Sequence, residues 1–191
     1  MSETQTFAPV AGGICAPQGF AAAGVHCGIR HNHEKPDLAL IKADVRCAGA
    51  ACYTTNKVYG APITVDREHL ADGYAQAILV NSGNANTCAP GGLELARATC
   101  ELAAQALGIP AADVLPSSTG VIGQPMSLEP FAAGIPAAAA PRSAPAAGRS
   151  AAAPGLVRAS RRIPGRREVL AAGEGAGGAV GGGGVGGVAA W

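Results

Sequence analysis

The sequence contains few aromatic side chains and no hydrophobic run long enough to cross a membrane. Phenylalanine, tryptophan and tyrosine together make up 4% of the 191 residues, so the core must be packed mainly from small aliphatic side chains. A membrane-spanning helix needs about 20 consecutive apolar residues, and no stretch reaches that length. The first residues, MSETQTFAPV, lack the basic and hydrophobic regions of a secretory signal. These absences predict a cytoplasmic protein.

A large excess of charge is also absent. The formal net charge is +1, which argues against a protein that binds nucleic acid or a membrane surface. The six cysteines include no C-x-x-C pair, and we expect them to be reduced and free of structural disulfides. The length is that of about one domain.

The composition changes abruptly after Ala138. Residues 1–138 contain 7 basic and 11 acidic side chains and carry a net charge of −4, whereas residues 139–191 contain 7 arginines and 2 glutamates and carry +5. The second segment is mainly alanine, glycine, arginine and proline, and its few large side chains cannot offset the entropy of ordering the chain. We expect residues 139–191 to be disordered, either as a genuine linker or tail or as a coding sequence read out of frame.

Strands and helices are expected to alternate within residues 1–138. The pattern predicts a half-buried strand over 37–47, a short strand over 61–65, a central strand over 74–80 that ends in a turn over 81–84, a helix over 92–107 and a helix from about Ser127. Val45 is placed on the buried face of the first strand, Gly108 fits the stop of the first helix, and Ser127 fits the N-cap of the second. The class is therefore α/β or α+β.

Four side chains of metal-binding type lie close together in the segment GVHCGIRHNHEKPD: His26, Cys27, His31 and His33. Imidazole and thiolate groups bind zinc. However, the spacing matches no standard zinc motif, and no second pair of ligands follows at a suitable distance. We therefore favour a solvated loop over a metal site.

The segment NSGNANTCAPGG (81–92) connects the predicted central strand to the predicted helix. A glycine-rich turn before a helix N-terminus can bind an anion through free backbone N–H groups, although the standard nucleotide-binding fingerprints are absent. Its first six residues hold four amide or hydroxyl side chains, more than a plain turn needs. A loop that shapes a polar pocket and an ordinary turn are both open.

The segment PSSTGVIG (116–123) follows two apolar residues, and we expect a turn there, just beyond a strand. A serine nucleophile needs a histidine base and a carboxylate, and the spacing of the histidines gives no support for one. Gly120 and Gly123 allow a tight turn that points N–H groups or the Thr119 hydroxyl at a developing negative charge, as in an oxyanion hole. From these residues alone, an oxyanion hole and a plain strand-to-helix turn are both open.

Taken together, four blocks resemble the ornithine acetyltransferase family, the bifunctional glutamate N-acetyltransferases of arginine biosynthesis. The blocks are GFAAAGVHCGIRHNHEKPDLALIKAD, TTNKVYGAPITV, AILVNSGNANTC and SSTGVIGQPM. The resemblance covers roughly residues 8–138 and implies a layered α/β sandwich with helices flanking stacked sheets. It also implies acetyl transfer from N-acetylornithine to glutamate through an acetyl-threonine. Many members also accept acetyl-CoA as donor, and no other cofactor and no metal is expected.

The resemblance assigns the oxyanion hole to Thr119 and Gly120. In the family, the precursor cuts itself before a threonine that becomes the nucleophile at the N-terminus of a second chain, and the two cleaved chains assemble into an oligomer. This sequence has no threonine after Thr119 and no lysine after Lys57, so we expect residues 1–138 to form the N-terminal part of an incomplete ornithine-acetyltransferase-like domain that is inactive alone. The alternative is a non-catalytic fragment or subunit that acts as an anion-binding or interaction module.

Overall fold

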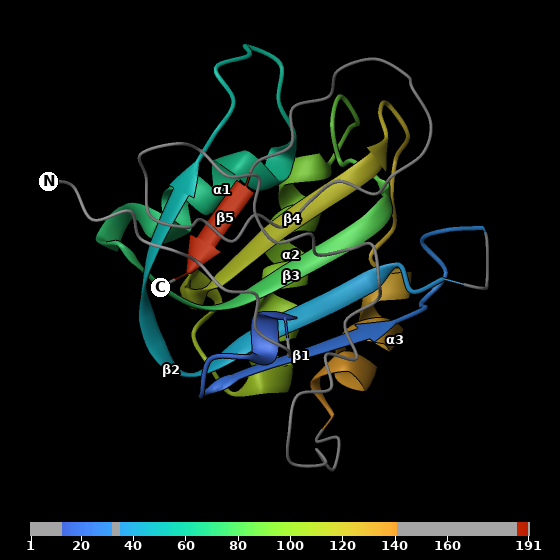
Figure 1. The fold of residues 1–191 in the computed structure, drawn as a ribbon. Helices are drawn as coiled ribbons and strands as arrows, with labels where there is room; N and C mark the ends of the chain where they lie inside the picture. The colour runs from blue at the N-terminus through green and yellow to red at the C-terminus, as the bar shows by residue number, and fades with distance from the viewer. Residues whose placement is uncertain (1–12, 32–34, 141–186, 191) are drawn as a thin grey trace, which may run out of the picture.

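The computed structural model describes residues 13–31, 35–140 and 187–190. Its strands are β1 (Phe20–Val25), β2 (Leu38–Cys52), β3 (Tyr74–Asn84), β4 (Val114–Val121) and β5 (Gly187–Ala190), and its helices are α1 (Ala61–His69), α2 (Gly92–Leu107) and α3 (Glu129–Ala139). Short 3-10 helices span Gly13–Cys15, Leu70–Asp72 and Ala111–Asp113. No helix in these ranges is long and apolar enough to cross a membrane. The alternation of strands and helices confirms the predicted α/β class (Figure 1).

The strands form one mixed sheet in the order β1-β2-β3-β4. β2 pairs antiparallel with both β1 and β3, whereas β3 and β4 run parallel. Parallel neighbours need a crossover connection, and α2 provides it. This βαβ unit brings the C-terminal ends of β3 and β4 to the same edge of the sheet.

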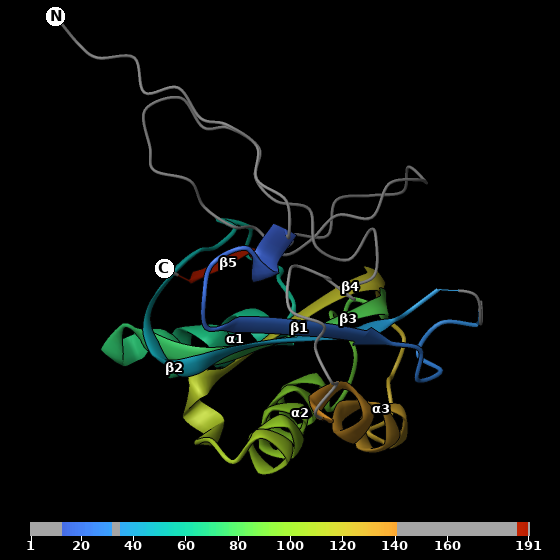
Figure 2. The same cartoon turned by 60° about the horizontal axis from the view of Figure 1, so that its bottom comes forward.

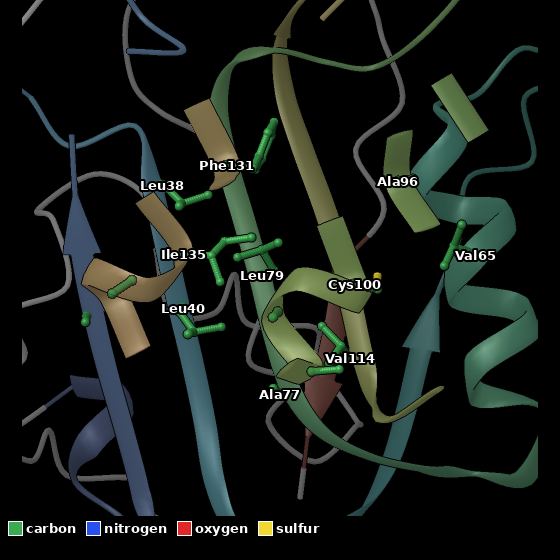
Figure 3. Packing of buried hydrophobic residues seen from close by; sticks show 14 residues of the cluster. Leu38, Leu40, Val65, Ala77, Leu79, Ala96, Cys100, Val114, Phe131 and Ile135 are labelled. Atoms are coloured by element: carbon green, nitrogen blue, oxygen red, sulfur yellow. The ribbon is translucent and has the colours of Figure 1, made fainter. Parts of the chain in front are cut away.

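One face of the sheet is covered by α2 and α3 (Figure 2), while α1 packs against β4 and α2. The main hydrophobic cluster fills the space between sheet and helices. Leu38 and Leu79 from the strands lie against Phe131 and Ile135 of α3, and Ala96 of α2 belongs to the same cluster (Figure 3). The small side chains of α2 let this helix lie close to the sheet, as the scarcity of aromatics predicts.

The opposite face of the sheet is apolar as well. A second buried cluster on it contains Ile41, Ile78, Val80 and Leu115. A sheet with two apolar faces belongs inside a layered structure, because each face must be covered by another layer. This arrangement agrees with the layered α/β sandwich that the resemblance implies.

The strand predicted over 61–65 is wrong, because these residues begin α1. Pro62 occupies the first turn of the helix, where its missing N–H would have no partner in any case. Ile63, Val65 and Asp66 are buried in the helix. Three consecutive β-branched residues at 63–65 favour a strand locally, but packing against β4 and α2 decides for the helix.

The ends predicted for the two parallel strands are also wrong. β3 continues through 81–84, where the sequence predicts a turn, and β4 continues to Val121, so PSSTGV is strand rather than a strand-to-helix turn. The two polar segments pair with each other in a parallel ladder. This long-range pairing outweighs the local turn preference of asparagine, serine and glycine.

The sequence predicts two helix termini, the end of α2 and the start of α3, and the structure agrees with the first of them. α2 ends with Gly108 as its C-cap in the left-handed conformation, as predicted. α3 begins at Glu129, and its N-cap is Leu128 without a side-chain capping hydrogen bond. Ser127 is therefore not the N-cap, and the predicted N-cap is one residue early.

β2 is longer than the strand predicted over 37–47. Val45, which the alternating pattern places on the buried face, is 68% exposed. The pairing of β2 with β3 is irregular between Lys42 and Cys47, and such an irregularity changes the side to which later residues point. The first part of the strand also differs from the half-buried strand predicted, because residues 38–41 are all buried, Leu38 and Leu40 on one face and Ala39 and Ile41 on the other.

The segment 139–191, expected to be disordered, lies mostly outside the described residues, and for residues 141–186 the expectation stays a prediction. The four residues of β5, in contrast to this expectation, form a strand. They pair antiparallel with residues 49–52 of β2, a strand end that offers free backbone hydrogen-bonding groups to a further strand.

Candidate functional site

The segments NSGN (81–84) and STGV (118–121) lie side by side at the C-terminal ends of β3 and β4. Their parallel register pairs Asn81 with Ser118, Ser82 with Thr119, and Gly83 with Gly120. In open α/β sheets, ligands commonly bind outside the carboxyl ends of the strands. The structure thus joins two segments that are separate in the sequence into one candidate site.

Gly83 and Gly120 allow the two backbones to approach closely at this point. Their φ angles are 116° and 137°, in the region that favours glycine. A Cβ atom on Gly120 would lie 2.3 Å from the carbonyl carbon of Gly83 and 2.5 Å from the backbone nitrogen of Asn84. A side chain at position 120 would therefore collide with backbone atoms of the neighbouring strand.

The loop of residues 26–31 reaches the same edge of the sheet. A Cβ atom on Gly83 would lie 2.8 Å from Cγ of Arg30 and 3.1 Å from the carbonyl oxygen of Ile29. Arg30 therefore packs directly on the NSGN segment. The loop that the sequence singles out for its histidines and cysteine is a third wall of the candidate site.

Asp37 is fully buried and anchors this loop. Its carboxylate accepts hydrogen bonds from the backbone N–H groups of Cys27 (2.7 Å), Gly28 (3.2 Å) and Arg30 (2.9 Å), and it lies 3.1 Å from Nδ1 of His26. Burial acts to raise the pKa of Asp37, but the hydrogen bonds and His26 outweigh it and hold the pKa below its ordinary value. The sequence pattern did not single out Asp37, although an aspartate directly before an apolar strand is a usable signal.

The same loop contains Cys27, one of the four residues that the sequence indicates as possible zinc ligands. Burial, with a contribution from Asp37, raises the pKa of the Cys27 thiol to about 12, which disfavours the thiolate that metal ions bind. Within the described ranges, no three histidine, cysteine, aspartate or glutamate side chains are grouped to hold a metal ion. His33 lies outside those ranges, so the interpretation as a loop without metal stays a prediction.

The amide side chains of NSGNAN are used to hold the site together. Nδ2 of Asn81 donates to the carbonyl of Asn84 (2.9 Å), and the Ser118 hydroxyl donates to Oδ1 of Asn81 (2.6 Å). Nδ2 of Asn86 donates to the carbonyl of Gly92 at the start of α2 (2.8 Å). All three asparagines are buried. These groups therefore fix the backbone and are not left open for a ligand.

Thr119 differs from its polar neighbours. Its side chain is half-buried, and its hydroxyl forms no hydrogen bond within the part of the chain that the structure describes. Gly120, the next residue, is exposed. The two residues assigned to the oxyanion hole thus lie together at an open strand end, with a hydroxyl donor available to a bound molecule; their catalytic role stays a prediction.

A buried carboxyl group packs against β4 from α1. Asp66 is 2% exposed, and its Oδ1 atom has no hydrogen-bond partner in the described structure. Burial raises the pKa of Asp66 to about 8. The sequence pattern places Asp66 in a polar stretch after a strand, so its burial was not predicted.

The pH dependence of unfolding is expected to reveal this carboxyl group. The folded protein holds the Asp66 proton up to about pH 8, whereas the unfolded chain releases it near the ordinary pKa of 3.8. Its contribution to stability is therefore fully present below about pH 4 and is lost as the pH rises to about 8. The loss is up to about 1.4 kcal/mol per pH unit.

D66N removes this slope, because asparagine does not titrate. We therefore expect the difference in free energy of unfolding, D66N minus wild type, to increase steadily from pH 5 to pH 8, since only wild type loses the contribution of the protonated acid. Denaturant titration of both proteins at each pH measures this difference. A difference between the two proteins that does not change with pH would show that Asp66 is not held protonated in the fold.

A model of the ArgJ family matches residues 21–163 of the chain. The chain belongs to the ArgJ family. ArgJ of Symbiobacterium thermophilum is 46% identical over 133 residues, which are 69% of this chain and 33% of the relative. ArgJ of Nitratidesulfovibrio vulgaris is 43% identical over 137 residues, which are 71% of this chain and 33% of that relative. Both relatives are named arginine biosynthesis bifunctional proteins, and the chain spans about a third of their length.

Two solved structures share the ArgJ fold. ArgJ from Bacillus halodurans has a TM-score of 0.62 at 38% identity, covering 64% of each chain. The ornithine acetyltransferase of Mycobacterium tuberculosis, complexed with ornithine, has a TM-score of 0.62 at 35% identity, covering 66% of this chain and 68% of that one. These matches confirm the family resemblance and the layered α/β class. The ArgJ family match continues past Ala138, where the composition changes.

Proposed function

We propose that this chain contributes Thr119 and Gly120 as oxyanion-stabilising residues to an ornithine acetyltransferase of arginine biosynthesis. The reaction transfers an acetyl group from N-acetylornithine to glutamate, and acetyl-CoA serves as a second donor. The observation that carries the proposal is the pairing of NSGN with STGV, which leaves an unused threonine hydroxyl beside exposed glycine backbone. ArgJ relatives and an ornithine-bound neighbour in the same fold support it.

The proposed role of these two residues follows from the negative charge that develops on an oxygen atom during acyl transfer. Acyl transfer passes through a tetrahedral intermediate whose former carbonyl oxygen carries a negative charge, and donors fixed in advance stabilise that oxygen. In this proposal the donors are the Thr119 hydroxyl and the Gly120 backbone. The hydrogen bond from Ser118 to Asn81 and the close contact of Gly120 with Gly83 hold the strand in place, so little reorganisation is needed during the reaction.

The nucleophile in this proposal is a threonine outside these 191 residues. The acetyl-threonine implied by the family lies downstream of the oxyanion motif, and the chain has no threonine after Thr119. Self-cleavage before that threonine would free an amine that serves as the base for its own hydroxyl. The working enzyme is accordingly proposed to combine this chain with a second one in the cytoplasm.

A split-chain assay tests the proposed function. The purified chain is mixed with the part of Symbiobacterium thermophilum ArgJ that its match does not cover, and acetyl transfer from N-acetylornithine to glutamate is measured. We expect turnover in the mixture and none with either part alone. Intact ArgJ and its own two separated parts serve as positive controls.

Two results would contradict the proposal. Turnover by the 191-residue chain alone would show that no external nucleophile is needed. A mixture that associates but stays inactive, while the separated parts of ArgJ regain activity with each other, would favour the non-catalytic interaction module instead.

A further inference from the structure

A small cavity lies between α1 and β4, directly beneath the residues that precede Thr119. Its walls include Gly60 and Asp66 on the α1 side and Ser117 and Ser118 on the β4 side. The space open to the centre of a water molecule is about 10 Å³, close to the minimum that a single buried water needs. The cavity therefore has room for one water molecule and for little else.

Asp66 is a buried polar group in this cavity whose Oδ1 atom lacks a partner in the described structure. The residue is 2% exposed, and Oδ1 makes no hydrogen bond to any described residue. Ser117 on the facing wall is 8% exposed. Buried polar atoms are nearly always paired, and where protein atoms cannot reach them an ordered water commonly does.

The charged groups around Asp66 do not supply a counter-ion. Arg67 stacks on the rings of Tyr53 and Tyr59, at 5.1 Å and 5.3 Å from their centroids. The Tyr53 hydroxyl is itself buried without a partner in the described structure. The carboxyl group of Asp66 is therefore not part of an ion pair with its neighbour Arg67.

Groups on the adjoining α2 helix do not neutralise Asp66 either. Arg97 of α2 pairs with Glu68 at 3.0 Å. Burial and the proximity of Asp66 raise the pKa of Cys100 to about 12, so this thiol is neutral. With its own pKa raised to about 8 by burial, Asp66 is a neutral acid at pH 7 and has a proton to donate.

We infer that one buried water molecule bridges the Asp66 carboxyl group to one of the two serine hydroxyls on the facing wall, that of Ser117 or that of Ser118. Asp66 is thereby a positioning residue for the part of β4 that carries Thr119. The Ser118 hydroxyl donates onward to Oδ1 of Asn81 at 2.6 Å, so the water completes a connection from α1 through β4 to β3. The effect on catalysis rests on the proposed function, whereas the water site does not.

A high-resolution crystal structure of the chain tests the water site directly. We expect one peak of electron density at about 2.7–3.2 Å from Oδ1 of Asp66 and from at least one of the two serine hydroxyls. An empty cavity would overturn the inference. So would a peak with contacts of about 2.4 Å to several oxygens, which would identify a bound cation.

Infrared spectroscopy tests the state of the acid independently of activity. We expect a C=O stretch of a protonated carboxyl group at pH 7 that is missing in D66N. If wild type and D66N give the same carboxyl bands at pH 7, Asp66 is ionised there, and the bridging role of a neutral acid is overturned.

Two variants of similar volume separate positioning from folding. D66N keeps a hydrogen-bond donor and acceptor, whereas D66L removes both. In the split-chain assay, at equal thermal stability, we expect D66N to keep a kcat close to that of wild type and D66L to lower kcat about 10-fold or more with little change in KM. Equal kcat values for D66N and D66L would overturn the positioning role. A bound water seen in a wild-type mixture that shows no turnover would instead count against the proposed function alone.

Discussion

Replacing Thr119 with alanine is expected to lower kcat for acetyl transfer in the split-chain assay by about 100- to 1,000-fold, because the change removes one donor to the oxyanion. The Thr119 hydroxyl makes no hydrogen bond inside the described structure and its side chain is half-buried. The free energy of unfolding should therefore change by no more than about 0.5 kcal/mol. A large loss of activity without a loss of stability would identify Thr119 as a residue that acts on the reacting atoms.

Two neighbouring changes serve as controls for T119A. T119S keeps the hydroxyl and is expected to retain most of the activity. S118A breaks the 2.6 Å hydrogen bond to Asn81 and is expected to cost about 1 kcal/mol of stability, while leaving the hydroxyl at 119 in place. If T119A keeps the kcat of wild type, Thr119 is not part of the oxyanion hole.

Replacing Gly120 with alanine is expected to disrupt the junction of β3 and β4. The new Cβ atom would lie 2.3 Å from the carbonyl carbon of Gly83, and residue 120 has a φ of 137° that alanine rarely adopts. The colliding atoms belong to the backbone, so relief requires a shift of the paired strands. We expect a loss of about 3–5 kcal/mol in the free energy of unfolding, together with loss of turnover in the split-chain assay.

Gly123 provides the matched control for G120A. Its φ is also positive, at 80°, but a Cβ atom there would meet nothing within 4 Å. G123A should therefore cost only the backbone strain, about 1–2 kcal/mol. Denaturant unfolding of both variants measures the difference, and equal costs would show that the close approach of Gly120 to Gly83 does not matter for stability.

Much of the fold follows from patterns that are local in the sequence. The apolar period over 92–107 and the glycine at 108 predict α2 and its end, because a helix buries one face and glycine readily adopts the left-handed C-cap. The apolar run over 74–80 predicts the central strand β3. At PSSTGVIG, local chemistry leaves an oxyanion hole and a plain turn both open. Only the family resemblance assigns the hole to Thr119 and Gly120, and that role stays a prediction.

Segments whose state depends on distant partners could not be assigned in this way. Residues 61–65 have the composition of a strand but form α1, because the buried side of this helix packs against β4 and α2. Residues 81–84 and 118–121 have the composition of turns but extend two strands, because each supplies hydrogen-bonding partners to the other. Local preference is small compared with the energy of such pairing and packing.

By itself, the sequence determined the α/β class, the α2 helix and the family, whereas the oxyanion hole that the resemblance assigns to Thr119 and Gly120 stays a prediction. Only the tertiary structure decided that NSGN and STGV are neighbouring strands, that Asp37 anchors a loop and that Asp66 is a buried, unpaired acid. The physical reason is the same in each case. Burial and pairing depend on which surfaces meet when the chain folds, and residues far apart in sequence supply those surfaces.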